Sequence, residues 1–194
     1  MKPDTGPDHE ASMDILKFFR LLYARLVTQG LPATGLWLFN VFNRYLLDRP
    51  VRGQCQVTPQ LFVGAQFRRR GWEILRGWGI NGVVSMRDEF DNASLGLAIP
   101  HYLRLPTVDD AAPTIEHLHQ GVEFMDGVIR DGGKVYVHCG AGVGRAPTMA
   151  AAYLVSQGAQ PEEAWRAIRS VRKFIRPTRV QREQLDRFAH SLRA

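Results

Sequence analysis

Cysteine is scarce in this chain, which has only Cys55 and Cys139 among its 194 residues. Two cysteines cannot build the framework of several disulfides that stabilises small secreted domains, so the fold must depend on an apolar core. A reducing compartment suits such a chain, and we expect a cytoplasmic protein. Cys55 is either a structural residue, which is the commoner case, or a partner that protects a reactive thiol by reversible oxidation.

Long apolar runs are also missing, because no stretch reaches the 18 uninterrupted apolar residues of a membrane-spanning helix. Residues 1–11 are polar and acidic, which excludes a secretory signal and predicts a disordered start. Residues 12–50 differ, since aromatic and leucine residues recur at helical spacing on both sides of a Gly-Leu-Pro break at 30–32. We predict an apolar helical extension. It either lies through residues 12–47 on the inner face of a membrane, or packs as a hairpin on the following domain or a second copy.

Acidic residues are outnumbered, with 19 Asp and Glu against 25 Lys and Arg, so the net charge is +6. This balance favours anionic partners such as phosphate esters, phosphoproteins or an anionic membrane face. No basic motif with interleaved aromatics is present, and we expect no nucleic-acid partner. Histidines, cysteines and carboxylates are not spaced as a metal-ligand set, so we expect neither a metal nor a cofactor.

The remaining chain, residues 51–194, reads as one catalytic domain of the α/β class. Short apolar runs at 61–64, 83–86, 101–105 and 135–137 have the composition of strands, and helical patterns lie between them. Strands that alternate with helices indicate a central, mostly parallel sheet flanked by helices. The predicted architecture is therefore this domain with the helical extension at its N-terminus.

The stretch around residues 135–148 carries the chemistry. A predicted strand ends at His138 and Cys139, a loop of small residues follows, and Arg145 precedes a helical pattern. A strand, a tight loop and a helix N-terminus point backbone N–H groups at a bound anion. Helix N-termini and nearby cations also stabilise a nucleophilic thiolate, and an arginine fork can hold two phosphate oxygens. We predict Cys139 as nucleophile and a phosphate-binding loop formed by Gly140, Ala141, Gly142, Val143, Gly144 and Arg145. The alternative is a buried strand-end cysteine followed by a plain glycine turn.

A proton donor for the leaving oxygen must come from elsewhere, because phosphate ester cleavage leaves an alkoxide. Two adjacent carboxylates, Asp109 and Asp110, follow the predicted strand at 101–105. A second acidic pair, Asp88 and Glu89, follows the strand at 83–86. Since loops at the carboxyl ends of parallel strands line one crevice, either pair can reach the loop.

The histidine, the cysteine, five intervening residues and the arginine resemble the phosphate loop of the cysteine-dependent protein tyrosine phosphatase superfamily, in its dual-specificity branch. The similarity covers roughly residues 57–190. It is strong from Leu103 to Arg176, where it includes the segments 103–109, 113–114, 121–124, 138–145, 150–154 and 161–164, and weak elsewhere. This resemblance implies a tyrosine-phosphatase-like fold and Asp109, rather than Asp110, as general acid. It also implies that His138 orients the cysteine, and that Asp88 or Glu89 braces Arg145 unless the pair is a plain acidic turn. Arg176 or Arg179 would lie close to substrate.

Within that family, the sequence looks like a mitochondrial phosphatase of phosphatidylglycerophosphate and its bacterial relatives. The resemblance implies hydrolysis of a phospholipid head-group phosphate through a phosphocysteine intermediate. A dual-specificity phosphoprotein phosphatase is the alternative. A third interpretation, a phosphate-binding module with weak catalysis, rests on Ala146, because many relatives have Ser or Thr directly after the loop arginine.

Overall fold

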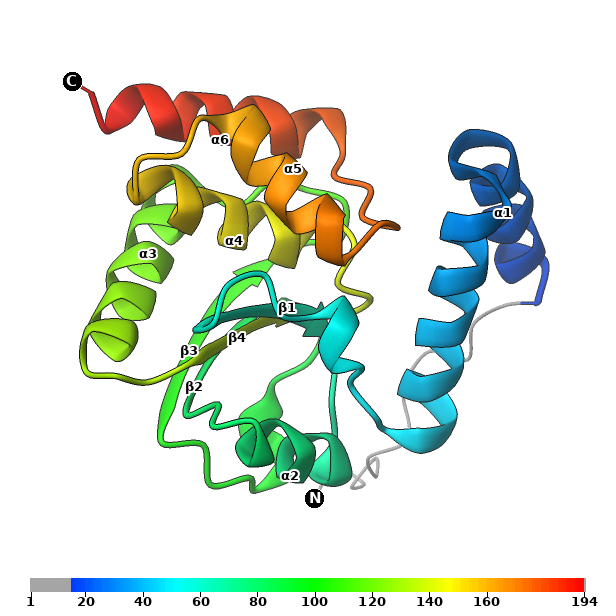
Figure 1. Cartoon of the computed structure of the whole chain (residues 1–194), viewed down its shortest axis with the longest axis horizontal. Helices are drawn as coiled ribbons and strands as arrows, with labels where there is room; N and C mark the ends of the chain where they lie inside the picture. Colours follow the sequence, from blue (N-terminus) through cyan, green and yellow to red (C-terminus); the bar gives the residue numbers. More distant parts are fainter. Residues whose placement is uncertain (1–14, 194) are drawn as a thin grey trace, which may run out of the picture.

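The computed structural model describes residues 15–193, so the predicted disordered start at 1–11 lies outside the described residues. Four strands form one sheet in the order β1-β4-β2-β3, and every neighbouring pair is parallel (Figure 1). The strands are β1 (Leu61–Ala65), β2 (Gly82–Arg87), β3 (His101–Thr107) and β4 (Val135–Cys139). The prediction of a mostly parallel sheet flanked by helices is confirmed.

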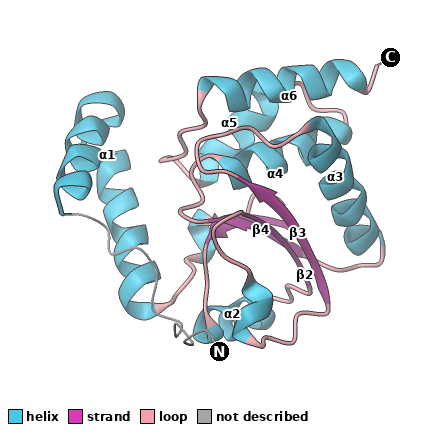
Figure 2. Ribbon diagram, turned by 180° about the vertical axis from the view of Figure 1, so that it is seen from behind, coloured by secondary structure: helices cyan, strands magenta, loops and turns pink. Residues whose placement is uncertain are grey.

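Both faces of the sheet are covered, which explains why its strands read as continuous apolar runs. Every residue of β1, β2 and β4 is buried, whereas the edge strand β3 has exposed positions. One face packs against α2 (Arg69–Gly77) and its neighbouring aromatics. The other packs against α3 (Ile115–Arg130) and α4 (Arg145–Ser156), and α5 (Pro161–Val171) and α6 (Arg179–Ser191) pack on α4 (Figure 2). Two short 3₁₀ helices, Arg52–Gln54 and Asn92–Leu95, complete the domain.

The last helix, α6, was not expected from the sequence, because its residues are mostly polar or charged. Thr178 caps its first turn and accepts a hydrogen bond from the Gln181 N–H at 3.3 Å. Leu185 and Phe188 are completely buried in the core. A cap and a narrow apolar stripe are sufficient for a helix when tertiary packing supplies most of its stability.

The predicted helical extension is present as α1 (Ile15–Leu47), and it bends sharply at Gly30 (φ 76°, ψ 173°). The left-handed φ suits glycine, and Pro32 follows two residues later. The two halves fold back on one another, since the rings of Phe18 and Trp37 stack at 5.9 Å between centroids. No helix of residues 15–193 combines the length and apolar character needed to cross a bilayer.

This extension packs on the catalytic domain, as one of the two alternatives expected. Arg25 Nη1 and Gln29 Nε2 donate to the backbone carbonyls of Phe174 and Ile175, each at 3.2 Å. At the other end, the Asp48 carboxylate accepts from the N–H groups of Arg68 and Gly71, both at 2.7 Å, and so caps α2. These contacts place α1 beside the connection between α5 and α6 (Figures 1 and 2).

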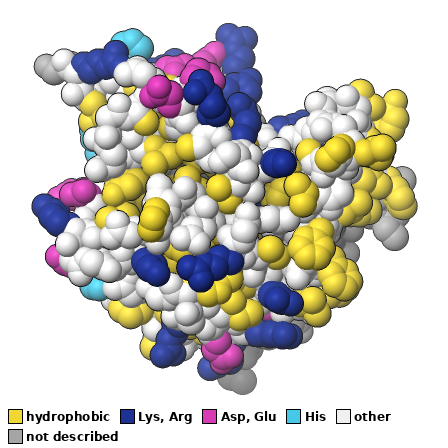
Figure 3. All heavy atoms as spheres, in the orientation of Figure 1, with side chains coloured by type: hydrophobic (Ala, Val, Ile, Leu, Met, Phe, Trp, Pro, Cys, Tyr) yellow, Lys and Arg dark blue, Asp and Glu magenta, His cyan; other side chains and the backbone are white. Residues whose placement is uncertain are grey.

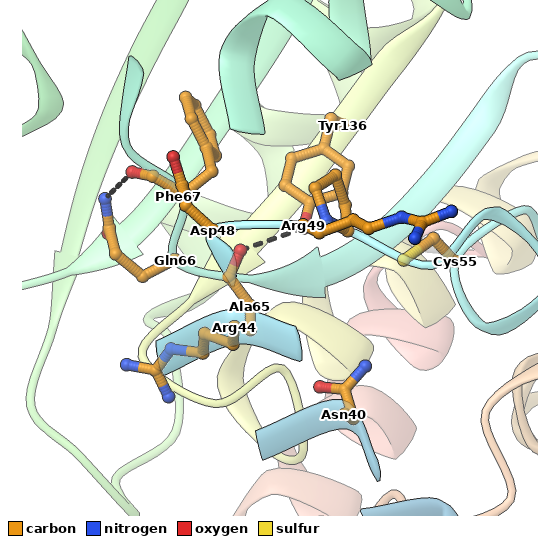
Figure 4. Close-up of a pocket in the computed structure, with 10 residues that line it drawn as sticks. Asn40, Arg44, Asp48, Arg49, Cys55, Ala65, Gln66, Phe67 and Tyr136 are labelled. Carbon is orange, nitrogen blue, oxygen red and sulfur yellow. Dashed lines mark hydrogen bonds between the residues drawn. The ribbon is translucent and has the colours of Figure 1, made fainter. Parts of the chain in front are cut away.

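The joint between α1 and the sheet is tightly filled. Figure 4 shows Asn40 and Arg44 of α1 near the end of β1, where the Tyr136 hydroxyl donates to the Ala65 carbonyl at 2.8 Å. The pocket that these residues line holds only about 10 Å³, which is close to the space of one water molecule. It is a packing seam rather than a ligand site.

Candidate active site

The loop predicted to bind phosphate joins β4 to α4 at the carboxyl edge of the sheet. Cys139 is the last residue of β4 and is buried, and Arg145 is the first residue of α4. The Gly142 N–H donates to the Cys139 sulfur at 3.3 Å. The thiol therefore faces the loop amides, as a nucleophile at this position would require.

Gly142 shows why this loop needs glycine. Its φ of 67° lies in the left-handed region, where side chains are strained. A β-carbon there would also collide with the Gly64 carbonyl group on β1 and come within 2.7 Å of Arg172 Nη2. Backbone conformation and space both exclude a larger residue, so the loop can turn tightly against β1 only with glycine here.

Arg145 is the most heavily bonded side chain in the site and is almost completely buried. Its Nη1 and Nη2 donate to the two carboxylate oxygens of Glu89 at 2.8 and 2.9 Å, and Nη1 also donates to the Thr107 carbonyl at 2.7 Å. Burial opposes the charge, but the Glu89 carboxylate raises the pKa of Arg145 above its usual value. The Nε is buried and has no hydrogen-bond partner among the residues that the structure describes.

Of the first acidic pair, Glu89 contacts the arginine and Asp88 does not. Arg87 Nε donates to Glu89 Oε1 at 3.0 Å, so this carboxylate bridges two arginines. Burial opposes ionisation, yet the hydrogen bonds and charges of Arg145 and Arg87 lower the pKa of Glu89 to about 2. Asp88 makes a different contact, in which its backbone carbonyl accepts a hydrogen bond from Arg104 Nη2 at 2.9 Å. That Glu89 braces Arg145 for catalysis stays a prediction.

In the second acidic pair, the Asp109 carboxylate contacts Arg145, and Asp110 makes a different contact. Asp109 Oδ1 lies 2.9 Å from Arg145 Nη2, although its side chain is 79% exposed. Asp110 occupies a left-handed corner of the turn (φ 62°), and its carbonyl accepts from the Thr178 hydroxyl at 3.1 Å. An exposed carboxylate that also contacts the site arginine has the reach expected of a general acid, which favours Asp109.

His138 lies on the opposite face of β4 from the loop sulfur. It is completely buried, and its ring contacts Phe67 and Tyr136 at centroid distances of 5.1 and 6.0 Å. Burial and the nearby Arg87 charge lower the pKa of His138 to about 3. A neutral, aromatic-packed imidazole fits the expected role of orienting the cysteine, which itself remains a prediction, and does not fit a base.

Two residues that hold the site were missed by sequence reasoning, and Arg172 is the first. It is 1% exposed, and its guanidinium donates to the carbonyls of Gly142 (2.6 Å), Ala141 (3.1 Å) and Gln54 (2.9 Å). It thus ties the back of the loop to the N-terminal part of the domain. A signal existed, because Arg172 continues the buried stripe of Trp165 and Ile168 at helical spacing.

Gln181 is the second. It is completely buried, and its Nε2 donates to the Ala111 carbonyl at 2.8 Å. Together with Thr178 it fastens the turn that bears Asp109 to the start of α6. Of the two arginines expected near substrate, Arg176 donates its backbone N–H to the Val143 carbonyl at 2.7 Å, whereas the exposed Arg179 pairs with Glu183 at 2.6 Å.

Comparison with known proteins places this geometry in context. Residues 61–191 match the family model for the dual specificity phosphatase catalytic domain. The human phosphatidylglycerophosphatase and protein-tyrosine phosphatase 1 is 33% identical over 149 residues, which are 72% of this chain and 74% of that protein. Rat dual specificity protein phosphatase 5 is 30% identical over 127 residues, and the match spans only 33% of its length. A crystal structure of PTPMT1 in complex with PI(5)P superposes with a TM-score of 0.65 at 32% identity, covering 71% of this chain and 94% of that one.

Proposed function

Because the chain belongs to the dual specificity phosphatase family and is a cysteine-dependent phosphatase, we propose that it acts through a phosphocysteine formed on Cys139. We further propose that its substrate is the head-group phosphate of a phospholipid, such as phosphatidylglycerophosphate. Both steps go beyond family membership and rest on the residues around the loop.

One observation carries the mechanism: a sulfur and a braced guanidinium flank the same short loop. The Cys139 sulfur accepts the Gly142 N–H, and Glu89 holds both Nη atoms of Arg145 while its Nε stays buried. Donors that are held in place before the substrate arrives need no reorganisation during the reaction. This arrangement supports stabilisation of a phosphoryl group in transfer.

In the proposed first step, the Cys139 sulfur attacks phosphorus and the bond from phosphorus to the leaving oxygen breaks. The substrate phosphate competes with Asp109 for Arg145 Nη2, so Asp109 leaves the guanidinium. Its carboxylate then takes up the proton of the monoprotonated phosphate ester and passes that proton to the leaving oxygen. Loop N–H groups from Gly140 to Arg145 bind the equatorial oxygens. A positioned carboxylic acid contributes roughly 10²–10⁴-fold to such a step.

In the second step, water attacks the phosphocysteine, gives a proton to Asp109, and the sulfur–phosphorus bond breaks to restore the thiolate. Ala146 offers no hydroxyl next to the loop, although it is buried at the start of α4. We expect this step to be slow and to produce burst kinetics. Equal rates for the two steps would contradict that expectation.

The proposal of a lipid substrate is supported by the relatives and by charge. The similar human protein is named a phosphatidylglycerophosphatase, and the similar solved structure holds PI(5)P, so both handle phosphorylated lipids by name. The net charge of +6 suits an anionic surface. The same human protein is also named a protein-tyrosine phosphatase, which keeps a phosphoprotein substrate as the second candidate.

We also propose that α1 seats the protein on the membrane surface that holds this lipid, which we expect to be the cytoplasmic face of the inner membrane. Figure 3 shows apolar side chains gathered over the part of the surface formed by α1. The large exposed apolar side chains of this helix are Phe19, Tyr23, Leu26, Val27, Leu31, Phe39, Phe42, Tyr45 and Leu46. Single exposed apolar residues are ordinary, but a contiguous group of this kind suits an interface.

Vesicle cosedimentation tests this seating. Phe39 and Phe42 are 51% and 52% exposed, so replacing both with serine should leave the fold intact. We expect the Phe39→Ser/Phe42→Ser variant to pellet less with phosphatidylglycerol vesicles than the parent chain does. Equal pelleting, or no pelleting of the parent, would remove the membrane from the proposal and leave its catalytic part untouched.

A substrate panel tests the function itself. We expect kcat/KM for phosphatidylglycerophosphate to exceed kcat/KM for phosphotyrosine and phosphoserine peptides. The reverse order would favour the phosphoprotein phosphatase. Absence of turnover on every substrate, including p-nitrophenyl phosphate, would favour the phosphate-binding module. The Cys139→Ser variant is the control, because it should lose turnover and still bind phosphate.

A further inference from the structure

A second basic site lies beside the loop, in a cleft of about 320 Å³ between α1 and the connection from α5 to α6. We call it the basic cleft. Thr28 and Gln29 of α1 form one wall, and Ile175 and Pro177 contribute to the other. Its four cationic side chains are Arg169, Lys173, Arg176 and Arg182. The family model begins at residue 61, so the α1 wall belongs to the part of the chain outside that match.

Among residues 15–193, no carboxylate forms an ion pair with any of these four side chains. One of these side chains, Arg182, donates a hydrogen bond from Nη1 to the Pro177 carbonyl at 3.3 Å. On α6, which also carries Arg182, the side chain of Arg179 does form an ion pair, with Glu183. The cleft therefore concentrates positive charge, whereas on the neighbouring surface a carboxylate compensates it.

The residues around the basic cleft show the same excess of positive charge. Arg25 of α1 is 4% exposed and donates to Gln29 at 2.7 Å, next to the cleft wall. Burial and the charges of Arg176 and Arg172 lower the pKa of Arg25 to about 10. Arg25, Arg172 and Arg176 are close enough to repel one another, which creates a positive potential that an anion would relieve.

The basic cleft is also joined to the catalytic loop by a single hydrogen bond. The backbone N–H of Arg176, which lines the cleft, donates to the carbonyl of Val143, in the middle of the loop, at 2.7 Å. Its other wall is attached to the same segment, since Gln29 Nε2 donates to the Ile175 carbonyl. The cleft and the catalytic loop are therefore in contact through the chain segment of Ile175 and Arg176.

We propose that the basic cleft binds a second phosphate group of the substrate while the loop holds the phosphate that is hydrolysed. The proposal rests on the function proposed above and narrows its substrate class to molecules with two phosphates. Arginine binds phosphate oxygens through its planar fork, and lysine binds them as a point charge, so both residue types fit. A cleft of this volume is within the range of ligand sites. Phosphatidylglycerophosphate has this chemistry, because a phosphodiester accompanies its terminal monoester.

The test compares two soluble substrates on the full chain: a short-chain phosphatidylglycerophosphate kept below its micelle concentration, and p-nitrophenyl phosphate, which has one phosphate. The variant is Arg169→Ala/Lys173→Ala. The matched control is Arg166→Ala/Arg187→Ala, which removes the same charge from exposed positions that do not line the cleft. The readout is the ratio of kcat/KM for the lipid to kcat/KM for the aryl phosphate.

We expect the ratio to fall about tenfold or more in the cleft variant, mainly through KM, because charge-assisted bonds to phosphate are the strong ones. The control should stay within about twofold, since both variants lose equal long-range attraction. Equal ratios in the two variants would overturn the proposal. A fall seen only when the lipid is presented in vesicles would also overturn it, because the cleft would then bind neighbouring head groups.

A binding measurement separates this proposal from the proposed function. In the Cys139→Ser background, the dissociation constant for the short-chain lipid should rise in the cleft variant and not in the control. If the parent enzyme fails to hydrolyse the lipid, the proposed function is wrong, and this binding difference still decides whether the cleft holds a second phosphate.

Discussion

Replacing Arg172 with lysine isolates the role of the guanidinium behind the catalytic loop. Arg172 bonds the carbonyls of Gly142, Ala141 and Gln54, and its Nη2 lies 3.4 Å from Asn40 Oδ1 of α1. Lysine keeps the charge and much of the apolar stem. It cannot reproduce the fork, so at least one or two of the three carbonyls lose their donor.

The expected cost follows from those carbonyls. A buried polar group left without a partner costs about 1–3 kcal/mol, so Arg172→Lys should lower the free energy of unfolding by about 2–4 kcal/mol. In a chain of this size each kcal/mol lowers Tm by about 2–4 °C, which gives a fall of roughly 5–15 °C. The loop carbonyls should also turn away, and a misplacement of about 1 Å in a catalytic loop costs about 10²-fold in rate.

The assay measures kcat for p-nitrophenyl phosphate at a temperature well below the Tm of the variant, together with thermal unfolding. Arg166→Lys is the control, because Arg166 lies on the same helix with an exposed side chain. We expect kcat to fall about 10–100-fold in Arg172→Lys, by loop misplacement, and to be unchanged in the control.

One result would refute this reasoning. If Arg172→Lys is destabilised but keeps the parent kcat while folded, the loop holds its shape without the clamp. If it does not fold, Asn40→Ala provides a milder test. Asn40 makes the longest of the four contacts and also donates to Gln54 Oε1 at 3.0 Å. Asn40→Ala should therefore cost about 1–2 kcal/mol, since two hydrogen bonds with a net value of about 1 kcal/mol or less each are lost.

Further predictions concern the loop and its ionisable neighbours. Gly142→Ala should abolish turnover, because the β-carbon would displace the loop from β1. Misplacement of a catalytic loop costs about 10²-fold in rate, so a kcat within about tenfold of the parent would contradict this prediction. Ala146→Ser should speed phosphocysteine breakdown and shrink the burst in stopped-flow traces, and an unchanged burst would show that a hydroxyl there does not help. Glu89→Gln should lower kcat/KM, because Arg145 would lose its charged brace, while circular dichroism remains unchanged. In urea titrations, the free energy of unfolding should fall as the pH is lowered from 6.5 toward 3. In this range His138 binds a proton in the unfolded chain, whereas in the folded protein it stays neutral, because burial lowers its pKa to about 3. The slope is about 1.4 kcal/mol per pH unit for one such group. A further loss should follow between pH 4.5 and 2, as the pKa of Glu89 is lowered from 4.5 to about 2, and Glu89→Gln should reduce that part alone. A flat profile across both ranges would contradict these assignments.

The catalytic loop could be predicted from the sequence because all its parts are neighbours in the chain. Strand, cysteine, small residues and arginine occupy residues 135–145, and local geometry alone brings the ends of such a loop together. The same reasoning holds for the strands, whose continuous apolar runs reflect burial on both faces, and for the break at Gly30. Family membership followed from the same residues and is shown by the match over residues 61–191.

The choice between adjacent acids depended on the tertiary structure. Asp88 and Glu89 are equally close to Arg145 in sequence, and so are Asp109 and Asp110, but the path of the backbone directs one carboxylate of each pair to the guanidinium. Which side chain of a pair faces the site is set by the register of strand and turn, and composition does not reveal it.

The sequence did not reveal the residues that hold the catalytic loop and the Asp109 turn in place, for a different reason. Arg172 lies 30 residues from the loop carbonyl it bonds, and Gln181 lies 70 residues from Ala111. Both are found among exposed arginines and polar residues that share their composition. Their function arises from burial, and burial is decided by how the last two helices and α1 pack around the sheet, because only that packing brings distant hydrogen-bond partners together.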